Sequence, residues 1–177
     1  MKRTAMALAA AAVALLTSTA SAQSGRPVTL GISAGAAIPM GDFADAYNTG
    51  YNGTVSVGFN SLGSPVGLRV DGMYNKFGGR DDVAIQTDAR IIGANANLVY
   101  SLPGQGIRPY LIGGGGIYGL KTDVPNSEQI TDFGINGGIG AAFPLSGFNT
   151  FIEARLHHVF TENQAMQFIP VTFGISF

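Results

Sequence analysis

The sequence contains no cysteine among its 177 residues. Disulfide bonds are therefore excluded, and so is attachment to a membrane through a lipidated cysteine. Charged residues are scarce as well: they make up 12% of the chain, whereas soluble domains average about 25%. Beyond the N-terminal segment, no apolar run approaches the ~20 residues of a transmembrane helix. These absences disfavour both an ordinary soluble domain and a helical membrane protein.

The N-terminal segment predicts a secretory signal peptide over residues 1–22. Lys2 and Arg3 precede an apolar run at residues 5–16, which is too short to span a bilayer. Residues 20–22 read Ala-Ser-Ala, the small-residue pattern of a cleavage site. We therefore expect an exported chain with one mature domain, residues 23–177.

The balance of charge argues against nucleic acid as a partner. The formal net charge is −1, and it becomes −3 when Lys2 and Arg3 leave with the signal peptide. A protein that binds nucleic acid usually carries a basic surface that neutralises phosphates. We predict no nucleic-acid partner.

Eight segments show apolar residues in alternation with small or polar ones, the period-two pattern of a β-strand. In the last segment the alternation is clearest, and we expect its Phe-rich face to meet lipid. In the fifth segment Gly113 to Gly116 erase the alternation, so a bulge or a one-residue slip would swap its faces. The eight expected strands cover residues 28–38, 53–60, 66–77, 89–101, 109–120, 132–143, 150–160 and 168–177.

The connections between these segments alternate in length. Those after the second, fourth and sixth segments are short, and the others are mostly longer and carry many of the acidic residues. An even number of strands with short turns at one end and longer loops at the other is the plan of outer-membrane barrels. We predict an all-β fold, an eight-stranded antiparallel up-and-down transmembrane β-barrel with both termini on the periplasmic side.

Alternation alone also fits a soluble barrel with an apolar interior. The composition of the other face, which carries the small and polar residues, distinguishes a soluble barrel from a membrane barrel. That face carries Gly, Ser, Thr, Asn and Ala, which fit inside a narrow cylinder, and not the Lys and Glu of a soluble surface. Aromatic residues near the strand ends suit the interfacial girdles of a membrane barrel. The aromatic residues that we expect to face lipid in this way are Tyr100, Tyr110, Tyr118, Phe133, Phe143 and Phe160.

Four charged residues lie in the middle of strands on the face that does not meet lipid: Arg69, Asp71, Glu153 and Arg155. A buried charge needs a partner, and both signs are present in equal number. An eight-stranded barrel is narrow enough for long side chains to meet across it. We predict a lumenal salt-bridge network; the alternative is a gate in a small conduction pathway.

The sequence offers little for catalysis. His157 and His158 are the only histidines, and on a strand they face opposite ways. This region resembles lipid A deacylase barrels, which carry a Ser two residues after a His, but Val159 and Phe160 occupy those positions here. We therefore predict no enzyme, and interpret His158 as an amphipathic anchor at the membrane interface.

No cofactor or metal site is predicted. Asp81, Asp82 and Asp88 share one loop, but their spacing is not that of an EF-hand. A solvated acidic loop, in contact with divalent cations near lipopolysaccharide, accounts for them.

Three motifs carry a family resemblance: IPMGDFADAYNTG at residues 38–50, RPYLIGGGG at 108–116 and FIEAR at 151–155. With the aromatic last strand they resemble the small outer-membrane β-barrel family, the OmpA, OmpX and opacity-protein type. The resemblance implies a monomer in the outer membrane of a Gram-negative cell, in contact with membrane lipid and lipopolysaccharide. It also implies that the barrel-assembly machinery reads the last strand through Phe173, Ile175 and Phe177.

The family resemblance specifies function only broadly. We expect a structural or surface-interaction role through the extracellular loops, with a lumen filled by side chains. Phe43, Tyr47 and Tyr51 in the first long loop are candidate contacts, unless they pack against the rim of the barrel. The alternative is a passive, OmpW-like channel for small or hydrophobic solutes, and a lipid A-modifying hydrolase is a further alternative.

Overall fold

The computed structural model describes residues 27–177 apart from 61–62, 81–86, 105, 124–128 and 163–164. The predicted signal peptide, residues 1–22, and the predicted loop residues Asp81 and Asp82 lie outside the described residues. The elements are β1 (Val28–Met40), α2 (Asp42–Ala46), β2 (Gly50–Asn60), β3 (Val66–Phe77), β4 (Ala89–Ser101), β5 (Arg108–Thr122), β6 (Ile130–Pro144), β7 (Asn149–Val159) and β8 (Met166–Ser176).

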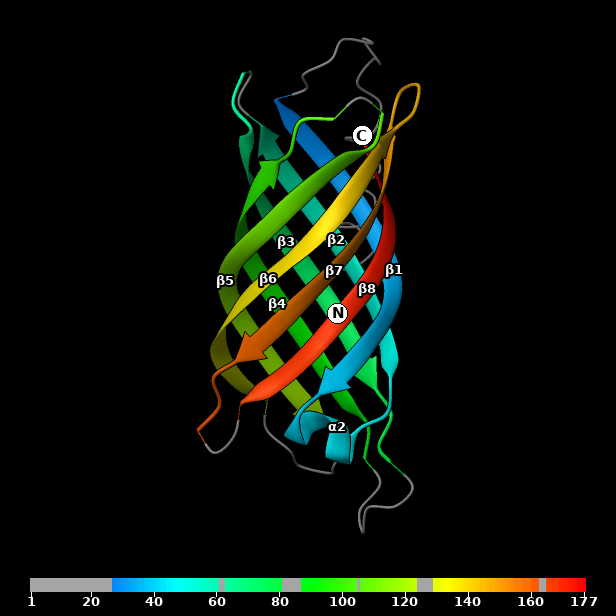
Figure 1. The fold of residues 1–177 in the computed structure, drawn as a ribbon. Coiled ribbons are helices and arrows are strands. Elements are labelled where there is room, and N and C mark those ends of the chain that lie inside the picture. The colour runs from blue at the N-terminus through cyan, green and yellow to red at the C-terminus, as the bar shows by residue number, and fades with distance from the viewer. Residues whose placement is uncertain (1–26, 61–62, 81–86, 105, 124–128, 163–164) are drawn as a thin grey trace, which may run out of the picture.

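The eight strands form one closed barrel in which every strand pairs antiparallel with the next along the chain (Figure 1). β8 pairs with β1 and completes the cylinder, with Ile32 opposite Ile175 in the register. Just past β8, the N–H of Phe177 donates to the carbonyl oxygen of Leu30 at 2.8 Å. The predicted all-β, up-and-down antiparallel barrel is confirmed, and its closure leaves no strand edge exposed.

The two ends of the barrel differ. The short turns and the C-terminus lie at one end, whereas α2 and the longer connections lie at the other, hereafter the loop end (Figure 1). Gly63, Gly106 and Gly147 each supply a positive φ in one of the three short turns, a conformation that other residues adopt only with strain. In the described part of the chain, no helix has the length and apolar character to cross a membrane.

Strand boundaries agree closely with the sequence pattern. β3 and β4 begin and end at the predicted residues. β2 begins earlier than predicted, at Gly50, because its ladder with β1 continues through Tyr51 opposite Ala36 and Gly50 opposite Ala37. β1 runs on to Met40 because its last residues, Pro39 and Met40, still pair with β8. The added residues, 39–40 and 50–52, lie outside the stretch of apolar alternation on which the prediction depended.

Apolar side chains point outward along most of each strand, and small or polar ones point into the lumen. Val55 and Leu98 are about 60% exposed on the outside, whereas Asn75, Asn95 and Asn97 are almost completely buried inside. This arrangement is the reverse of a soluble barrel and agrees with the predicted assignment of faces.

Two residues of β5 contradict that assignment. We expected Tyr110 and Tyr118 to face lipid, but they are only 8% and 1% exposed and point into the lumen. The alternation runs through Gly113–Gly116 without a slip, so that Leu111 and Ile117 point outward in their place. These four glycines carry no side chain that could show which residues of β5 face lipid. For this reason the sequence pattern gave the wrong face for the two tyrosines.

The glycines of β5 allow a close approach to β4. A Cβ atom built on Gly116 would overlap the carbonyl oxygen of Ala94, a backbone atom with no freedom to move aside. Gly137 on β6 differs, because a Cβ atom there would meet only the carbonyl oxygen of Ile112 at 3.9 Å.

We therefore expect Gly116→Val to destabilise the barrel by about 1–3 kcal/mol through overpacking, and Gly137→Val to have little effect. The measurement is the temperature at which the fast-migrating folded form disappears on a denaturing gel. Equal midpoints for the two variants would contradict the close-approach argument.

Candidate functional site

The four predicted charges meet in the middle of the lumen. Arg69 on β3 binds Glu153 on β7 in a fork, with Nη1–Oε2 at 2.9 Å and Nη2–Oε1 at 2.8 Å. Arg155 binds Asp71 across the lumen, Nη1–Oδ2 at 2.6 Å. Each arginine also contacts the carboxylate on its own strand: Arg69 Nε lies 3.0 Å from Asp71, and Arg155 Nε lies 2.8 Å from Glu153.

These four residues, hereafter the charge ring, form a closed and neutral arrangement. Every carboxylate contacts both guanidinium groups, so that β3 and β7 are joined although they are not neighbours in the sheet. Asp71, Glu153 and Arg155 are each no more than 5% exposed. Charge-assisted and two-pronged contacts of this kind satisfy buried ions without solvent.

Two further side chains complete the charge ring, and the sequence analysis missed both. Tyr110 on β5 donates from its hydroxyl to Glu153 Oε2 at 2.8 Å. Asn97 on β4 donates from its amide to Asp71 Oδ2 at 2.9 Å. The amide-rich lumenal face of β4 could have indicated Asn97, whereas Tyr110 was assigned to the wrong face.

Nearer the loop end, the lumen contains an apolar cluster in place of the charges. Phe77 and Phe168 are fully buried, with ring centroids 5.7 Å apart in an edge-on arrangement. Phe43 from α2 packs on Phe77 at 5.1 Å. The cluster, hereafter the apolar plug, consists of Ala37, Phe43, Met73, Phe77, Ala89, Ile91, Tyr118, Val159, Met166 and Phe168.

The structure separates the three candidate contacts of the first long loop. Phe43 is 8% exposed and belongs to the apolar plug, and Tyr47 packs on it with ring centroids 4.7 Å apart. Burial raises the pKa of the Tyr47 phenol. Tyr51 lies elsewhere, 56% exposed on the outside of β2 and beside Tyr74. Phe43 and Tyr47 therefore pack against the rim of the barrel, and of the three candidates only Tyr51 is exposed enough to contact other molecules.

The two histidines lie on opposite faces of β7. His157 is buried in the lumen, where its Nδ1 atom lies 2.8 Å from the hydroxyl of Tyr118 and its ring stacks on Phe168 at 4.9 Å. His158 lies on the outer side, with Nδ1 at 2.9 Å from Nε2 of Gln167. The hydrogen-bond partners of the two rings are a phenol and an amide, and neither is a Ser hydroxyl.

The C-terminal end of the last strand presents its aromatic side chains on the outside, whereas Phe168 near its start points into the lumen. Phe173 is 60% exposed and Phe177 is 39% exposed, with Ile175 half-buried between them. Among the described residues, no group of three or more His, Cys, Asp or Glu residues is arranged to hold a metal ion.

Comparisons with known proteins agree with this architecture. A sequence model for the outer membrane protein beta-barrel domain matches residues 6–177. No curated protein sequence matches the chain.

Solved structures with the same fold include three small barrels. Neisserial surface protein A has a TM-score of 0.67 at 15% identity, covering 87% of this chain and 98% of the neisserial one. Ail, the attachment invasion locus protein of Yersinia pestis, has a TM-score of 0.55 at 15% identity, covering 85% and 97%. The outer membrane enzyme PagL has a TM-score of 0.51 at 15% identity, covering 84% and 97%.

At such identities the structural likeness shows the fold alone, whereas the family match covers nearly the whole chain. The chain thus belongs to the outer membrane protein beta-barrel domain family and is located in the outer membrane.

Proposed function

We propose that this protein is a sealed structural barrel of the outer membrane, a monomer that acts through its extracellular loops and its outer wall. The observation that carries the proposal is the pair of layers that fills the lumen. The charge ring occupies the middle, and the apolar plug occupies the loop end beneath α2. A solute that entered from either end would have to displace one of them.

The chemistry of the two layers supports a seal. The charge ring is neutral, and each of its ions already has partners of the opposite sign, so it offers no net field that would attract an ion. The apolar plug disfavours ions because its side chains are apolar apart from the hydroxyl of Tyr118, which is already hydrogen-bonded to His157, and so they do not replace the hydration of an ion. The passive-channel alternative needs both layers to open.

We also propose that the protein is not an enzyme. Hydrolysis of a lipid ester requires a nucleophile next to a base. Within the part of the chain that the structure describes, neither histidine ring is hydrogen-bonded to a Ser hydroxyl, and His157 is fully buried among lumenal side chains. The fold shared with PagL does not supply the missing nucleophile, since one barrel architecture serves many functions.

We expect the purified protein to give no steady current in planar lipid bilayers. The reason is that the charge ring and the apolar plug occupy two successive levels of the lumen. A reproducible conductance that changes in Arg155→Ala would overturn the sealed-barrel proposal, because it would place the charge ring in a conducting pathway.

The charge ring should also stabilise the barrel. Asp71→Asn removes the charge that faces Arg69 and Arg155 and leaves buried guanidinium charge uncompensated, at a cost of about 3–5 kcal/mol. Asp88→Asn is the matched control. Its carboxylate forms an exposed ion pair with Lys76 at 2.8 Å, and exposed pairs contribute little.

The stability of both variants is measured as the midpoint temperature at which the folded, fast-migrating form is lost on a denaturing gel. A midpoint for Asp71→Asn as high as that of Asp88→Asn would show that the charge ring is not a stabilising element.

For assembly, we propose that Phe173, Ile175 and Phe177 are the residues that the barrel-assembly machinery reads. They are supported by the outward position of Phe173 and Ile175 on β8 and of Phe177 just past it, on the strand that closes the cylinder against β1. Before the last strand pairs with β1, this row of two aromatic and one aliphatic side chains is available to an assembly factor.

We expect Phe177→Ala to lower the amount of barrel inserted into outer membranes of living cells, with little change in refolding into detergent micelles. Phe160→Ala is the control, because Phe160 is 49% exposed outside but lies at the loop end, the opposite end of the barrel from Phe177. Equal insertion of the two variants would remove Phe177 from the proposed signal.

A further inference from the structure

The outer wall carries a row of three cations at the loop end. Lys76 on β3 lies opposite Arg90 on β4, and Arg90 lies opposite Lys121 on β5. Residues directly opposite each other on paired strands point to the same side of the sheet. Tyr74, two residues before Lys76, and Ile92, two residues after Arg90, are both exposed on the outside. Because residues two apart on a strand point to the same side of the sheet, the cations point outward as well.

This row, hereafter the basic row, occupies one side of the barrel only. The strands β1, β2, β6 and β8 contain no Lys or Arg, and the single arginine of β7 is Arg155, which points into the lumen. Arg108 lies at the opposite end, at the start of β5. The row is therefore a local feature and not a girdle around the whole rim.

Two aspartates hold part of the basic row in place. Lys76 binds Asp88 at 2.8 Å and Arg90 binds Asp123 at 2.6 Å, whereas Lys121 has no ion pair within the described ranges. The hydrogen bond from Lys76 lowers the pKa of Asp88. Like charges on opposing strand positions repel, so an external anion would stabilise the row.

Neighbouring tyrosines place the basic row at the membrane interface. Tyr51 lies opposite Lys76, and its ring centroid is 6.3 Å from that of Tyr74. Exposed tyrosines on a barrel wall mark the level of lipid headgroups. Since the long loops of such barrels are extracellular, the row lies at the headgroups of the outer leaflet.

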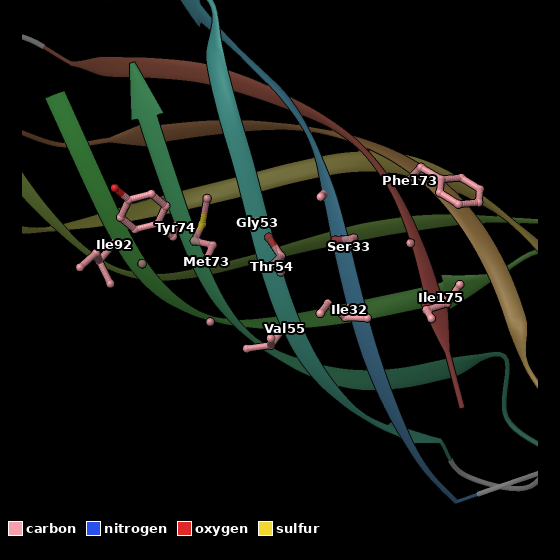
Figure 2. A pocket seen from close by; sticks show the side chains of 14 residues that line it. Ile32, Ser33, Gly53, Thr54, Val55, Met73, Tyr74, Ile92, Phe173 and Ile175 are labelled. Carbon is pink, nitrogen blue, oxygen red and sulfur yellow. The ribbon is translucent and has the colours of Figure 1, made fainter. Parts of the chain in front are cut away.

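An apolar groove of about 790 Å³ crosses the wall next to the basic row, over β8, β1, β2, β3 and β4 (Figure 2). Its outward-facing floor consists of small residues, Ala34, Gly53 and Gly72, between the larger Val55 and Tyr74. A Cβ atom on Gly53 would meet no heavy atom within 4 Å, so the space above it is open.

The groove and the basic row are continuous. Tyr74 and Ile92 line the groove and are paired across β3 and β4. They lie one outward position below Lys76 and Arg90, a step of about 6.5–7 Å along a strand. A molecule with an anionic head and a hydrocarbon tail could contact both features at once.

We propose that the basic row and the groove form one binding site for lipopolysaccharide, with a lipid A phosphate on the cations and an acyl chain in the groove. Lys121 and the two ion-paired cations supply charge-assisted hydrogen bonds to phosphate. The groove supplies close packing for the chain, which is what distinguishes one lipid-facing surface from another in a bilayer. This binding site is independent of the sealed-barrel proposal. It requires only that the loop end of the barrel faces the outside of the cell.

The test is native mass spectrometry of the full mature protein, purified from outer membranes and exchanged with defined lipids. The lipids are diphosphorylated lipid A, dephosphorylated lipid A and phosphatidylglycerol. We expect the double variant Lys76→Gln, Lys121→Gln to bind diphosphorylated lipid A about tenfold more weakly, as for the loss of hydrogen bonds to a charged group. Arg108→Gln, at the other end of the barrel, should bind as the unchanged protein does.

A second pair of variants tests the groove. Gly53→Ile fills the open space and should weaken binding of diphosphorylated lipid A about as much, by overpacking against the acyl chain. Gly137→Ile adds the same side chain on β6, outside the groove, and should leave binding unchanged. The folded gel mobility of each variant is checked first, and Lys121→Gln alone replaces the double variant if that fails to fold.

Three outcomes would overturn the proposal. Undiminished binding of lipid A by the cation and Gly53 variants would show that the site is elsewhere. Equal binding of dephosphorylated lipid A would remove the role of phosphate. Tighter binding of phosphatidylglycerol would reassign the site to an anionic phospholipid. Failure of the sealed-barrel proposal would be seen as a steady conductance, a measurement that these variants do not affect.

Discussion

The pairing of β8 with β1 is the constraint on which the rest of the structure depends. Within a bilayer there is no water to bind the N–H and C=O groups of a free strand edge, so the sheet must close on itself. Closure with eight strands sets a narrow lumen. It also divides every strand into residues that meet lipid and residues that must fill the interior.

The narrow lumen explains the two layers inside it. Charges there have no access to bulk solvent, so Arg69 and Arg155 must be neutralised by Asp71 and Glu153 at contact distance. Toward the loop end, α2 carries Phe43 onto Phe77 and covers an apolar interior. The outside follows the opposite rule, and its small departures from a uniform apolar wall, the basic row and the groove, are the features that give the surface specificity.

Much of the fold could be predicted because the sequence pattern has a physical period. The middle parts of β3 and β4 alternate apolar residues with polar ones, and the boundaries predicted for both strands agree with the structure. The prediction failed for Tyr110 and Tyr118 because Gly113–Gly116 carry no side chain that could continue the pattern. An aromatic residue near a strand end fits a lipid interface and a lumen equally well, and only its hydrogen-bond partner distinguishes the two.

The eight strands, their order and the face on which four charges lie follow from the sequence alone, since these depend on local periodicity and on the cost of a buried charge. The tertiary structure decided which charges contact each other, because residues 84 positions apart meet only when the barrel closes. It also decided that Phe43 turns inward, and that Lys76, Arg90 and Lys121 fall in one row. Cross-strand register sets that row, and register is fixed by the ladder of backbone hydrogen bonds around the whole cylinder.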